Sequence, residues 1–253
     1  MRIVIPELKN DLVQKAIVAF PKIDFIEADS PENAAKLVRD GLAESMISGL
    51  EYPSRDVLLT YKKILSLNSE YFSSCFMCRK DKSFFALADG GVNKTPNRNQ
   101  LLVIVEDTAK TFQKFTGKTP KIAMLSYSTN GSGGKNLDLE KIHFVIDKIR
   151  REHPEYIIDG EMQLDVAIDP EVAKKKYPNS AIMGDANVLI VPDLNSGNIL
   201  YKSLERFGGF TVAGPIIQGF SVPLADLSRG STVDDIILTI SILINQIELE
   251  SRQ

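Results

Sequence analysis

The sequence contains few cysteines and histidines, the residues that bind zinc and, in the case of cysteine, carry out redox chemistry. It has two cysteines and two histidines in 253 residues. Cys75 and Cys78 have the C-x-x-C spacing of redox and zinc sites, but they fall in a predicted strand, where positions three apart point to opposite faces. A zinc site would need further ligands, and His143 and His153 both fall inside a predicted helix. The pattern therefore favours two buried strand thiols and no metal site.

The sequence also lacks a charge bias and a long apolar run. The formal net charge is -3 and we find no basic stripe, so nothing indicates a nucleic-acid partner. No apolar run reaches the roughly 20 residues that a membrane-spanning helix needs. The opening residues Met1–Ile5 lead into a strand rather than a signal peptide, so we expect a cytoplasmic protein with no membrane partner.

Strand and helix patterns alternate along the chain. Apolar segments between turn residues predict strands at Arg2–Ile5, Ile23–Ile26, Glu44–Ser48, Tyr71–Arg79, Ser83–Ala88, Lys121–Leu125, Tyr156–Ile158, Asn187–Val191 and Thr211–Ala213. Helical spacing predicts helices at Lys9–Phe20, Pro31–Asp40, Ser54–Leu65, Asn97–Phe115, Leu137–Glu152, Gln163–Tyr177, Ser196–Phe207 and from Val233 onward. This alternation predicts an α/β protein in which a mainly parallel sheet lies between two helical layers, a three-layer α/β/α arrangement.

The polar and glycine-rich turns of this sheet indicate where a site should lie. In mainly parallel sheets, ligands bind beyond the carboxyl ends of the strands. Such turns follow Leu125, Ile158, Val191 and Ala213, so we expect the site at these four strand ends.

The final helix is apolar nearly all round. One stripe suffices for a core, and it comprises Val233, Ile236, Ile237, Ile240, Leu243, Ile244 and Ile247. Leu238, Ile242 and Leu249 lie off that stripe. Either the helix is fully buried or it forms a subunit interface, and the flanking Glu248 and Glu250 favour the interface.

The start of this helix carries a compact polar set. Ser228, Arg229 and Asp235 supply a hydroxyl, a cation and a carboxylate, and Thr232 can serve as the N-cap. A helix N-terminus can hold a phosphate or a developing anion. These residues are equally compatible with a capping box beside a solvated arginine.

Two other segments are candidates for binding an anion. The loop Ser126–Gly134 follows a strand and precedes a helix, and its hydroxyls and glycines suit a phosphate, although it can also be a flexible connection. The P-loop order is absent because Asn136 follows Gly134-Lys135, and no G-x-G-x-x-G motif occurs. Arg206 ends a helix, where it either complements the helix dipole or binds a phosphate.

Six segments carry specific motifs in a fixed order: Leu125–Ser132, Asp159–Asp165, Pro192–Asn198, Tyr201-Lys202 with Arg206, Gly214–Gly219 and Asp226–Gly230. In this order they resemble the phosphate acetyl/butyryl transferase family, which includes the phosphate acetyltransferases. Most of the residues that match the family lie between about Phe85 and Ile244, and few lie in the first 80 residues.

The resemblance implies a reversible transfer of an acetyl or other short acyl group between coenzyme A and inorganic phosphate, as in acetate metabolism. It also implies two lobes with an interdomain cleft, a fold like that of the isocitrate and isopropylmalate dehydrogenases, and a homodimer. On this basis we expect a first lobe of residues 1–70 plus 219–253 and a second lobe of residues 71–218. No permanently bound cofactor or metal is implied, and coenzyme A or acetyl-CoA enters as a substrate.

The resemblance also assigns roles to residues. Asp235 matches the proposed base for the coenzyme A thiol, Ser228 matches a hydroxyl that orients the reacting groups, and Arg229 and Arg206 match cations on the acyl phosphate. The substrate- and phosphate-binding positions implied are Ser128, Thr129, Asn130, Gly131, Ser132, Asn198 and Tyr201.

The chain departs from the family in its first lobe. Leu59 stands where the family has an arginine, although Arg55, Lys62 or Lys63 in the same predicted helix could substitute. A further segment of several dozen residues, with another arginine, has no counterpart. Three interpretations remain open: an active phosphate acyltransferase with a shortened first lobe, an acyltransferase of altered acyl or carrier specificity, and a non-catalytic homologue that binds phosphate or coenzyme A.

Overall fold

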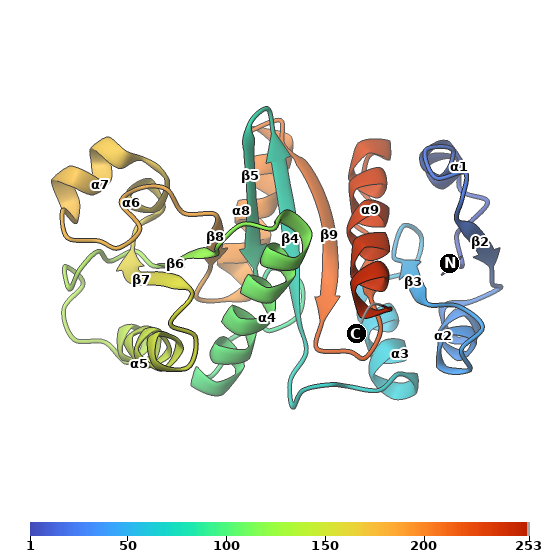
Figure 1. The fold of residues 1–253 in the computed structure, drawn as a ribbon, viewed down its shortest axis with the longest axis horizontal. Helices are drawn as coiled ribbons and strands as arrows, with labels where there is room; N and C mark the ends of the chain where they lie inside the picture. Colours follow the sequence, from blue (N-terminus) through green and yellow to red (C-terminus); the bar gives the residue numbers. More distant parts are fainter. Residues whose placement is uncertain (252–253) are drawn as a thin grey trace. The chain divides into compact units, whose positions relative to one another are not determined.

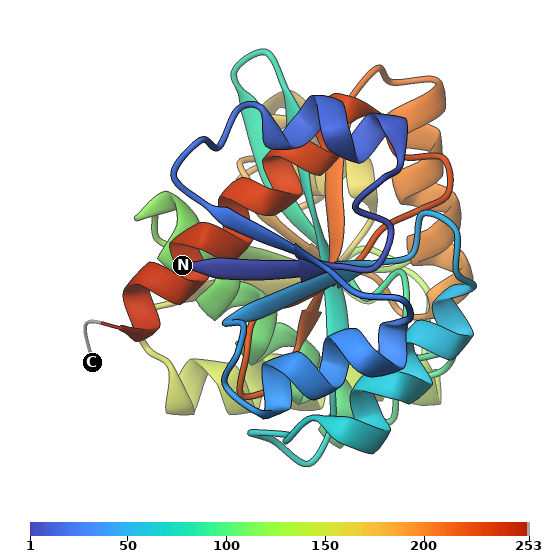
Figure 2. The same ribbon diagram turned by 90° about the vertical axis from the view of Figure 1, so that its right-hand side faces the viewer.

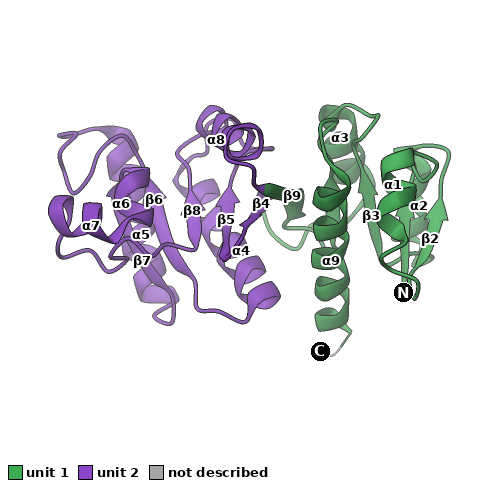
Figure 3. Ribbon diagram, turned by 90° about the horizontal axis from the view of Figure 1, so that it is seen from above, with its two compact units in different colours: residues 1–72, 211–253 green, residues 73–210 purple. Residues whose placement is uncertain are grey.

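The computed structural model describes residues 1–251, which form two compact units (Figures 1 and 3). Unit 1 comprises Met1–Phe72 and the chain from Thr211 onward, and unit 2 comprises Ser73–Phe210. Each unit is a sheet with helices on both faces, so the predicted α/β class is confirmed.

Unit 1 contains a five-stranded sheet in the order β2-β1-β3-β10-β9. The strands are β1 (Arg2–Ile5), β2 (Asp24–Glu27), β3 (Ser45–Ser48), β9 (Thr211–Gln218) and β10 (Leu224–Asp226). All neighbours pair in parallel except β9, which runs antiparallel to β10. The parallel strands β1, β3 and β10 therefore end at one edge, where Glu7, Gly49 and Ser228 follow them.

Four helices cover this sheet. They are α1 (Asp11–Ile17), α2 (Pro31–Arg39), α3 (Ser54–Ile64) and α9 (Val233–Glu250). Figure 2 shows α1 and α9 on one face and α2 and α3 on the other. The sequence signals placed α2 correctly: Ser30 accepts the Asn33 N–H, and Pro31 occupies the first helical position, where no N–H partner is needed.

Unit 2 contributes five strands, which pair in the order β4-β5-β8-β6-β7. The strands are β4 (Ser73–Lys80), β5 (Ser83–Ala88), β6 (Lys121–Leu125), β7 (Ile157–Met162) and β8 (Val188–Ile190). β4 and β5, both predicted as strands, form an antiparallel hairpin, and the strands from β5 to β7 pair in parallel. The carboxyl ends of β5, β6, β7 and β8 thus lie at a common edge.

The helices of unit 2 are α4 (Arg98–Thr116), α5 (Leu137–Glu152), α6 (Leu164–Ile168), α7 (Pro170–Lys176) and α8 (Leu194–Arg206). Figure 1 shows α4 and α5 on one side of the unit 2 strands and α6, α7 and α8 on the other. Phe76, Met77 and Phe112 are among the largest side chains of the core and are almost completely buried.

Both cysteines are buried thiols of β4, as predicted. Burial raises the pKa of the Cys75 thiol, and the charges of Asp89 and Asp107 raise it further. Such a thiol stays protonated and is a poor nucleophile. Within residues 1–251, the His, Cys, Asp and Glu side chains form no group of three or more that could hold a metal ion.

The interface interpretation of the final helix stays a prediction, because Ile237, Ile244 and Leu249 of α9 are partly exposed. Leu238 is 5% exposed and Ile242 is fully buried, so this chain itself covers two of the three apolar residues outside the main stripe of α9. Helix α9 packs on β9 and also against α1, so two of its sides are covered. Although α9 is strongly apolar, no helix in the described part of the chain is long and apolar enough to cross a membrane.

Two predicted turns are strand interiors. β9 continues through Gly214-Pro215 to Gln218, because the Gly214 N–H donates to the Thr239 hydroxyl of α9 (2.9 Å) and proline has no N–H to pair. Since β9 pairs with β10, residues 211–218 belong to unit 1 rather than to the second lobe. Likewise β7 runs four residues past Ile158, so Asp159-Gly160-Glu161 lies within a strand.

Candidate active site

In unit 1, the predicted site residues Ser228 and Arg229 lie in the short loop between β10 and α9. The Leu227 N–H donates to the Ser48 carbonyl, the Ser231 N–H to the Ser228 carbonyl (2.9 Å) and the Gly230 N–H to the Ser228 hydroxyl oxygen (3.2 Å). Because that oxygen acts as an acceptor, the hydroxyl hydrogen can donate to a ligand. The loop therefore holds its backbone in place while the Arg229 side chain is exposed.

Asp235 completes a capping box at the start of α9. Its Oδ2 accepts the Thr232 N–H and the Thr232 hydroxyl, both at 2.7 Å, and the Thr232 hydroxyl oxygen accepts the Asp235 N–H. Its Oδ1 accepts the Val212 N–H of β9 at 2.6 Å, and the residue is 2% exposed. Three of the roughly four acceptor positions of this carboxylate are thus occupied inside the protein.

Two buried acids lie beside this loop, and neither was predicted as a site residue. Glu7 Oε1 accepts the Ser48 hydroxyl (3.1 Å) and the Gly49 N–H (2.8 Å), and Asp226 ends β10. Glu7 is 4% and Asp226 2% exposed, and Glu7 Oε2 and Asp226 Oδ1 are buried without a hydrogen-bond partner. A Cβ on Gly49 would meet Asp226 Oδ1 at 2.3 Å, so only glycine fits between the two acids.

The Asp226 carboxyl should make stability depend on pH. Burial raises its pKa to about 7, which the Ser54 hydroxyl opposes and the Glu7 charge reinforces. A raised acid pKa means that the folded state binds more protons than the unfolded state between about pH 4 and pH 7, so stability falls as pH rises through that window. Asp226→Asn should therefore gain stability relative to the wild type as pH rises, approaching roughly 4 kcal/mol at pH 7.5, at about 1.4 kcal/mol per pKa unit.

Chemical denaturation of both proteins from pH 4 to pH 8 measures this difference. Asp56→Asn, at an exposed acid of α3 in the same unit, is the control and should show a flat difference. A flat difference for Asp226→Asn as well would contradict the assignment of a raised pKa to Asp226.

In unit 2, the loop 126–134 follows β6 and uses its own polar groups to hold its shape. Every backbone N–H from Ser128 to Gly134 donates to an acceptor in unit 2: the Ser126, Ser128 and Ser132 hydroxyls, the Thr129, Gly131 and Glu161 carbonyls, and the Glu161 carboxylate. Ser128 and Thr129 are buried, whereas Asn130, Gly131 and Ser132 are exposed. A phosphate at this loop would accordingly meet the side chains of Asn130 and Ser132 rather than backbone N–H groups.

Glu161 of β7 is the anion that this loop already binds. Its Oε1 accepts the Ser128 hydroxyl (2.7 Å) and the Gly131 N–H (2.8 Å), and its Oε2 contacts His143 Nε2 of α5. Burial raises the pKa of the Glu161 carboxyl, but the hydrogen bonds from Gly131, Ser128 and His143 lower it more, so it lies below the ordinary value. Glu161 falls in the Asp159–Asp165 motif, but the resemblance implies no role for it.

Replacing Glu161 with glutamine should loosen the loop. Hydrogen bonds to a charged group contribute about 1.5–3 kcal/mol, so we expect the amide hydrogen of Gly131 to exchange at least about tenfold faster. Because a lowered carboxyl pKa gives stability that is lost as pH falls below about 4, the wild-type loop should loosen similarly in acid. Glu140→Gln, at an exposed acid of α5, is the control. Unchanged exchange at Gly131 would show that Glu161 does not hold the loop.

Helix α8 carries the remaining predicted residues. The Asn198 side chain donates to the Gly90 carbonyl (3.4 Å), and Tyr201 stacks on Phe76 with ring centroids 4.1 Å apart. Tyr201 is only 6% exposed, so most of its ring packs in the core. Arg206 lies in the last turn of α8 with its side chain 58% exposed and 3.4 Å from Glu205.

The start of α8 is fixed by the loop that follows β5. Asp89, directly after β5, accepts the N–H groups of Gly91, Val92 and Asn93 and also contacts the Ser74 hydroxyl. A Cβ on Gly197 of α8 would meet the Asp89 carbonyl at 2.6 Å. This close approach places Asn198 against the carboxyl end of β5.

Comparison with known proteins supplies the family. The family model described as phosphate acetyl/butaryl transferase matches residues 8–244. The chain belongs to this family. It is 40% identical over 208 residues to the phosphate acetyltransferase of Corynebacterium glutamicum, covering 81% of this chain and 63% of that protein. The chain thus spans less than two thirds of that relative's length.

Solved structures of the family have the same fold. A phosphotransacetylase from Streptococcus pyogenes superposes with a TM-score of 0.85 at 29% identity, covering 98% of this chain and 94% of that one. A branched-chain phosphotransacylase from Enterococcus faecalis V583 gives a TM-score of 0.83 at 25% identity, covering 98% and 99%. The fold that the resemblance implied is therefore confirmed.

All the site residues predicted for this phosphate acetyl/butaryl transferase family member lie inside the matched range. Within unit 1, Ser228, Arg229 and Asp235 belong to one loop and the adjoining helix turn. Within unit 2, the loop 126–134 and the start of α8 both lie at the carboxyl edge of the sheet. Leu59, where the resemblance predicts an arginine, is 54% exposed on α3.

Proposed function

We propose that this protein is a phosphate acyltransferase, which transfers an acetyl or other short acyl group reversibly between coenzyme A and inorganic phosphate. The observation that carries the proposal is the exposed side chain of Arg229, next to Ser228 in the sequence, on a loop fixed by hydrogen bonds, within a chain of this family. A guanidinium presents several N–H donors in a plane and suits the oxygens of a phosphate.

The reaction forms one bond and breaks one. The coenzyme A sulfur attacks the acyl carbon of the acyl phosphate, a carbon–sulfur bond forms, and the carbon–oxygen bond to phosphate breaks. The proton of the thiol leaves with the departing phosphate. Negative charge builds up on the carbonyl oxygen and the leaving phosphate. We therefore assign most of the rate acceleration to positive groups such as Arg229 and Arg206, which stabilise this charge in the transition state.

Asp235, which the resemblance assigns as the base, is in our proposal a minor contributor. A free thiol has a pKa of about 8.5 and a free aspartate about 3.9, so complete proton transfer between unshifted groups costs roughly 6 kcal/mol. Three hydrogen bonds also occupy the Asp235 carboxylate. Proton removal must then be concerted with attack on the acyl carbon.

The remaining residues keep the roles that the resemblance assigns. We propose that Ser228 donates a hydrogen bond to the reacting groups, and that Asn130, Ser132 and Asn198 contact the phosphate side. Ser128, Thr129, Gly131 and Tyr201 would act by shaping the binding surface, since they are engaged in the hydrogen bonds and stacking described above. The homodimer, a cytoplasmic location and the absence of a permanently bound cofactor stay predictions.

The test is thioester formation by the purified protein. Acetyl phosphate and coenzyme A should give an increase in thioester absorbance at a rate proportional to protein concentration. A protein that binds coenzyme A but forms no thioester from any acyl phosphate would be a non-catalytic homologue, and the proposal would be wrong.

The acyl group is a separate question, because the chain is similar to phosphotransacylases of different acyl preference. Acetyl, propionyl, butyryl and isobutyryl phosphates should be compared by kcat/KM. Highest activity with acetyl phosphate supports a phosphate acetyltransferase, and highest activity with a branched acyl phosphate supports altered specificity within the same chemistry.

A further inference from the structure

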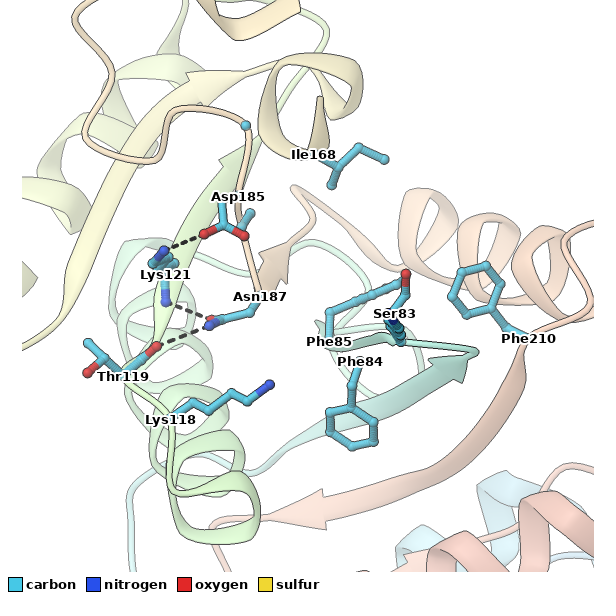
Figure 4. Close-up of a pocket in the computed structure, with 13 residues that line it drawn as sticks. Ser83, Phe84, Phe85, Lys118, Thr119, Lys121, Ile168, Asp185, Asn187 and Phe210 are labelled. Atoms are coloured by element: carbon cyan, nitrogen blue, oxygen red, sulfur yellow. Dashed lines mark hydrogen bonds and ion pairs between the residues drawn. The ribbon is translucent and has the colours of Figure 1, made fainter. Parts of the chain in front are cut away.

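A cavity of about 660 Å³ lies in unit 2, where β5, β6 and β8 begin (Figure 4). It exists because β8 has only three residues: the first β5 residue paired with β8 is Ala86, so Ser83–Phe85 extend beyond it. The loop before β8 and the start of β6 form the other walls. We call it the lysine cavity, after Lys82, Lys118 and Lys121, which line it.

The lining of the lysine cavity has an excess of positive charge. Asp185 is its one acidic residue, and Asp185 is ion-paired with Lys121. Lys82 and Lys118 therefore add two positive charges that no carboxylate of the lining neutralises. Figure 4 shows the Lys118 side chain extending toward the β5 side of the cavity. Ammonium groups arranged around one hollow suit an anion with several oxygens, such as a phosphate.

Aromatic side chains form another wall. Phe85 and Phe210 make an edge-to-face pair with ring centroids 5.6 Å apart, and both are partly exposed. Lys80 lies 5.8 Å from the Phe210 ring centre and donates to the Gly208 carbonyl (2.7 Å), which adds a further cation beside this wall. A flat ring can pack on such side chains, so the cavity offers an apolar face next to a cationic one.

The wall between β6 and β8 is held in place by Asn187. Its Oδ1 accepts the Lys121 N–H (2.7 Å), its Nδ2 donates to the Thr119 carbonyl (3.0 Å), and its own carbonyl accepts the Ala86 N–H (2.9 Å). One residue thus links β5 to both ends of the neighbouring turn. Ligand sites are usually such preformed hollows of 300–1,000 Å³ with a few fixed polar groups.

The lysine cavity is separate from the phosphate-side loop 126–134. β6 runs from Lys121 at the cavity to Leu125 at the loop, and four steps of about 3.3 Å separate them by roughly 13 Å. A ligand in the cavity therefore need not compete with phosphate at that loop.

We infer that the lysine cavity binds a nucleotide, that is, a small molecule in which a phosphate group is joined to a flat aromatic base. The phosphate lies against Lys82 and Lys118, and the base packs on Phe85 and Phe210. The source is either a free nucleotide or the adenosine phosphate part of coenzyme A, and the two share this chemistry.

Calorimetric titration of the full chain with ADP tests the inference. Lys82→Gln/Lys118→Gln should weaken ADP binding at least tenfold, and raising the salt concentration should weaken binding to the wild type. Lys174→Gln/Lys175→Gln, which removes two exposed lysines of α7, is the matched control and should bind like the wild type. Phe210→Leu should weaken ADP while leaving inorganic pyrophosphate unaffected. Titration with coenzyme A in place of ADP distinguishes the two sources.

Equal ADP affinity in the two double variants would overturn the inference, and so would a loss of ADP binding in Arg229→Ala alone. In the thioester assay without nucleotide, we expect the Lys174→Gln/Lys175→Gln control to retain wild-type activity. Lys82→Gln/Lys118→Gln should retain it too if the source is a free nucleotide, and should show a raised KM for coenzyme A at unchanged kcat if the source is coenzyme A. If the proposed function is wrong, neither the wild type nor any variant will form thioester. If only the inference about the lysine cavity is wrong, the wild type will form thioester, but the two double variants will bind ADP equally well.

Discussion

Arg229→Ala is expected to lower kcat/KM for acyl transfer about 100-fold while leaving the melting temperature nearly unchanged. The side chain is exposed, so its loss removes little packing. A guanidinium on the phosphate or carbonyl oxygen makes charge-assisted hydrogen bonds of about 1.5–3 kcal/mol each, and 1.4 kcal/mol is a factor of ten in rate. Steady-state thioester formation at matched protein concentrations measures the effect.

Two control variants show whether the loss of activity comes from the Arg229 guanidinium itself or from the loss of any exposed positive charge. Arg39→Ala removes another exposed arginine of unit 1, which is paired with Asp40, and should retain full activity. Arg229→Lys keeps the charge without the planar donor set and should recover part of the rate. An Arg229→Ala enzyme within threefold of the wild type would exclude this arginine from the chemistry.

Asp235→Ala is expected to destabilise the protein by about 3 kcal/mol. The change leaves the Val212 N–H, the Thr232 N–H and the Thr232 hydroxyl without their acceptor. A buried donor left unsatisfied costs about 1–3 kcal/mol, and loss of a cap alone costs about 1 kcal/mol. Asp234→Ala, at the exposed acid beside it, loses only a favourable helix-dipole contact and should cost less than about 1 kcal/mol.

The activity of folded Asp235 variants distinguishes a structural from a catalytic role of this carboxylate. Measured at a temperature where the variant is folded, Asp235→Asn should retain much more activity than Arg229→Ala. Equal losses of kcat in folded protein would contradict our weighting and would return Asp235 to the role of general base. Denaturation curves for both variants establish the folded fraction in each assay.

Local signals in the sequence were sufficient for most of the fold. The Ser30-Pro31 start of α2, the Thr232–Asp235 capping box and the β4–β5 hairpin each depend on residues a few positions apart. The strand ends after Leu125 and Val191 were placed to within one residue. These features follow from backbone hydrogen bonding within single elements, which sequence spacing reflects directly.

The sequence did not predict contacts between residues that lie far apart along the chain. Glu7 and Asp226 lie over 200 positions apart in sequence, and Glu161 reaches the Gly131 N–H from 30 positions away. β10 has only three residues, too few for a periodic pattern. The lysine cavity combines five separate segments, around residues 84, 119, 168, 186 and 210. In each case the contact arises from the sheet topology, and no local spacing indicates it.

The sequence could not decide what covers α9, for a related reason. Its composition correctly indicated that apolar residues on more than one side need cover. Whether another subunit or this chain supplies that cover depends on where β9 and α1 pack, and the sequence of α9 does not contain that information. Leu238 and Ile242 are covered by the chain itself.

The most direct test of the account is the release of free coenzyme A thiol from acetyl-CoA as a function of phosphate concentration. We predict that release rises with phosphate to saturation, vanishes when phosphate is omitted, and is matched mole for mole by acetyl phosphate. Thiol release that proceeds equally without phosphate would mean that water accepts the acyl group, and the account of a phosphate acyltransferase would be contradicted.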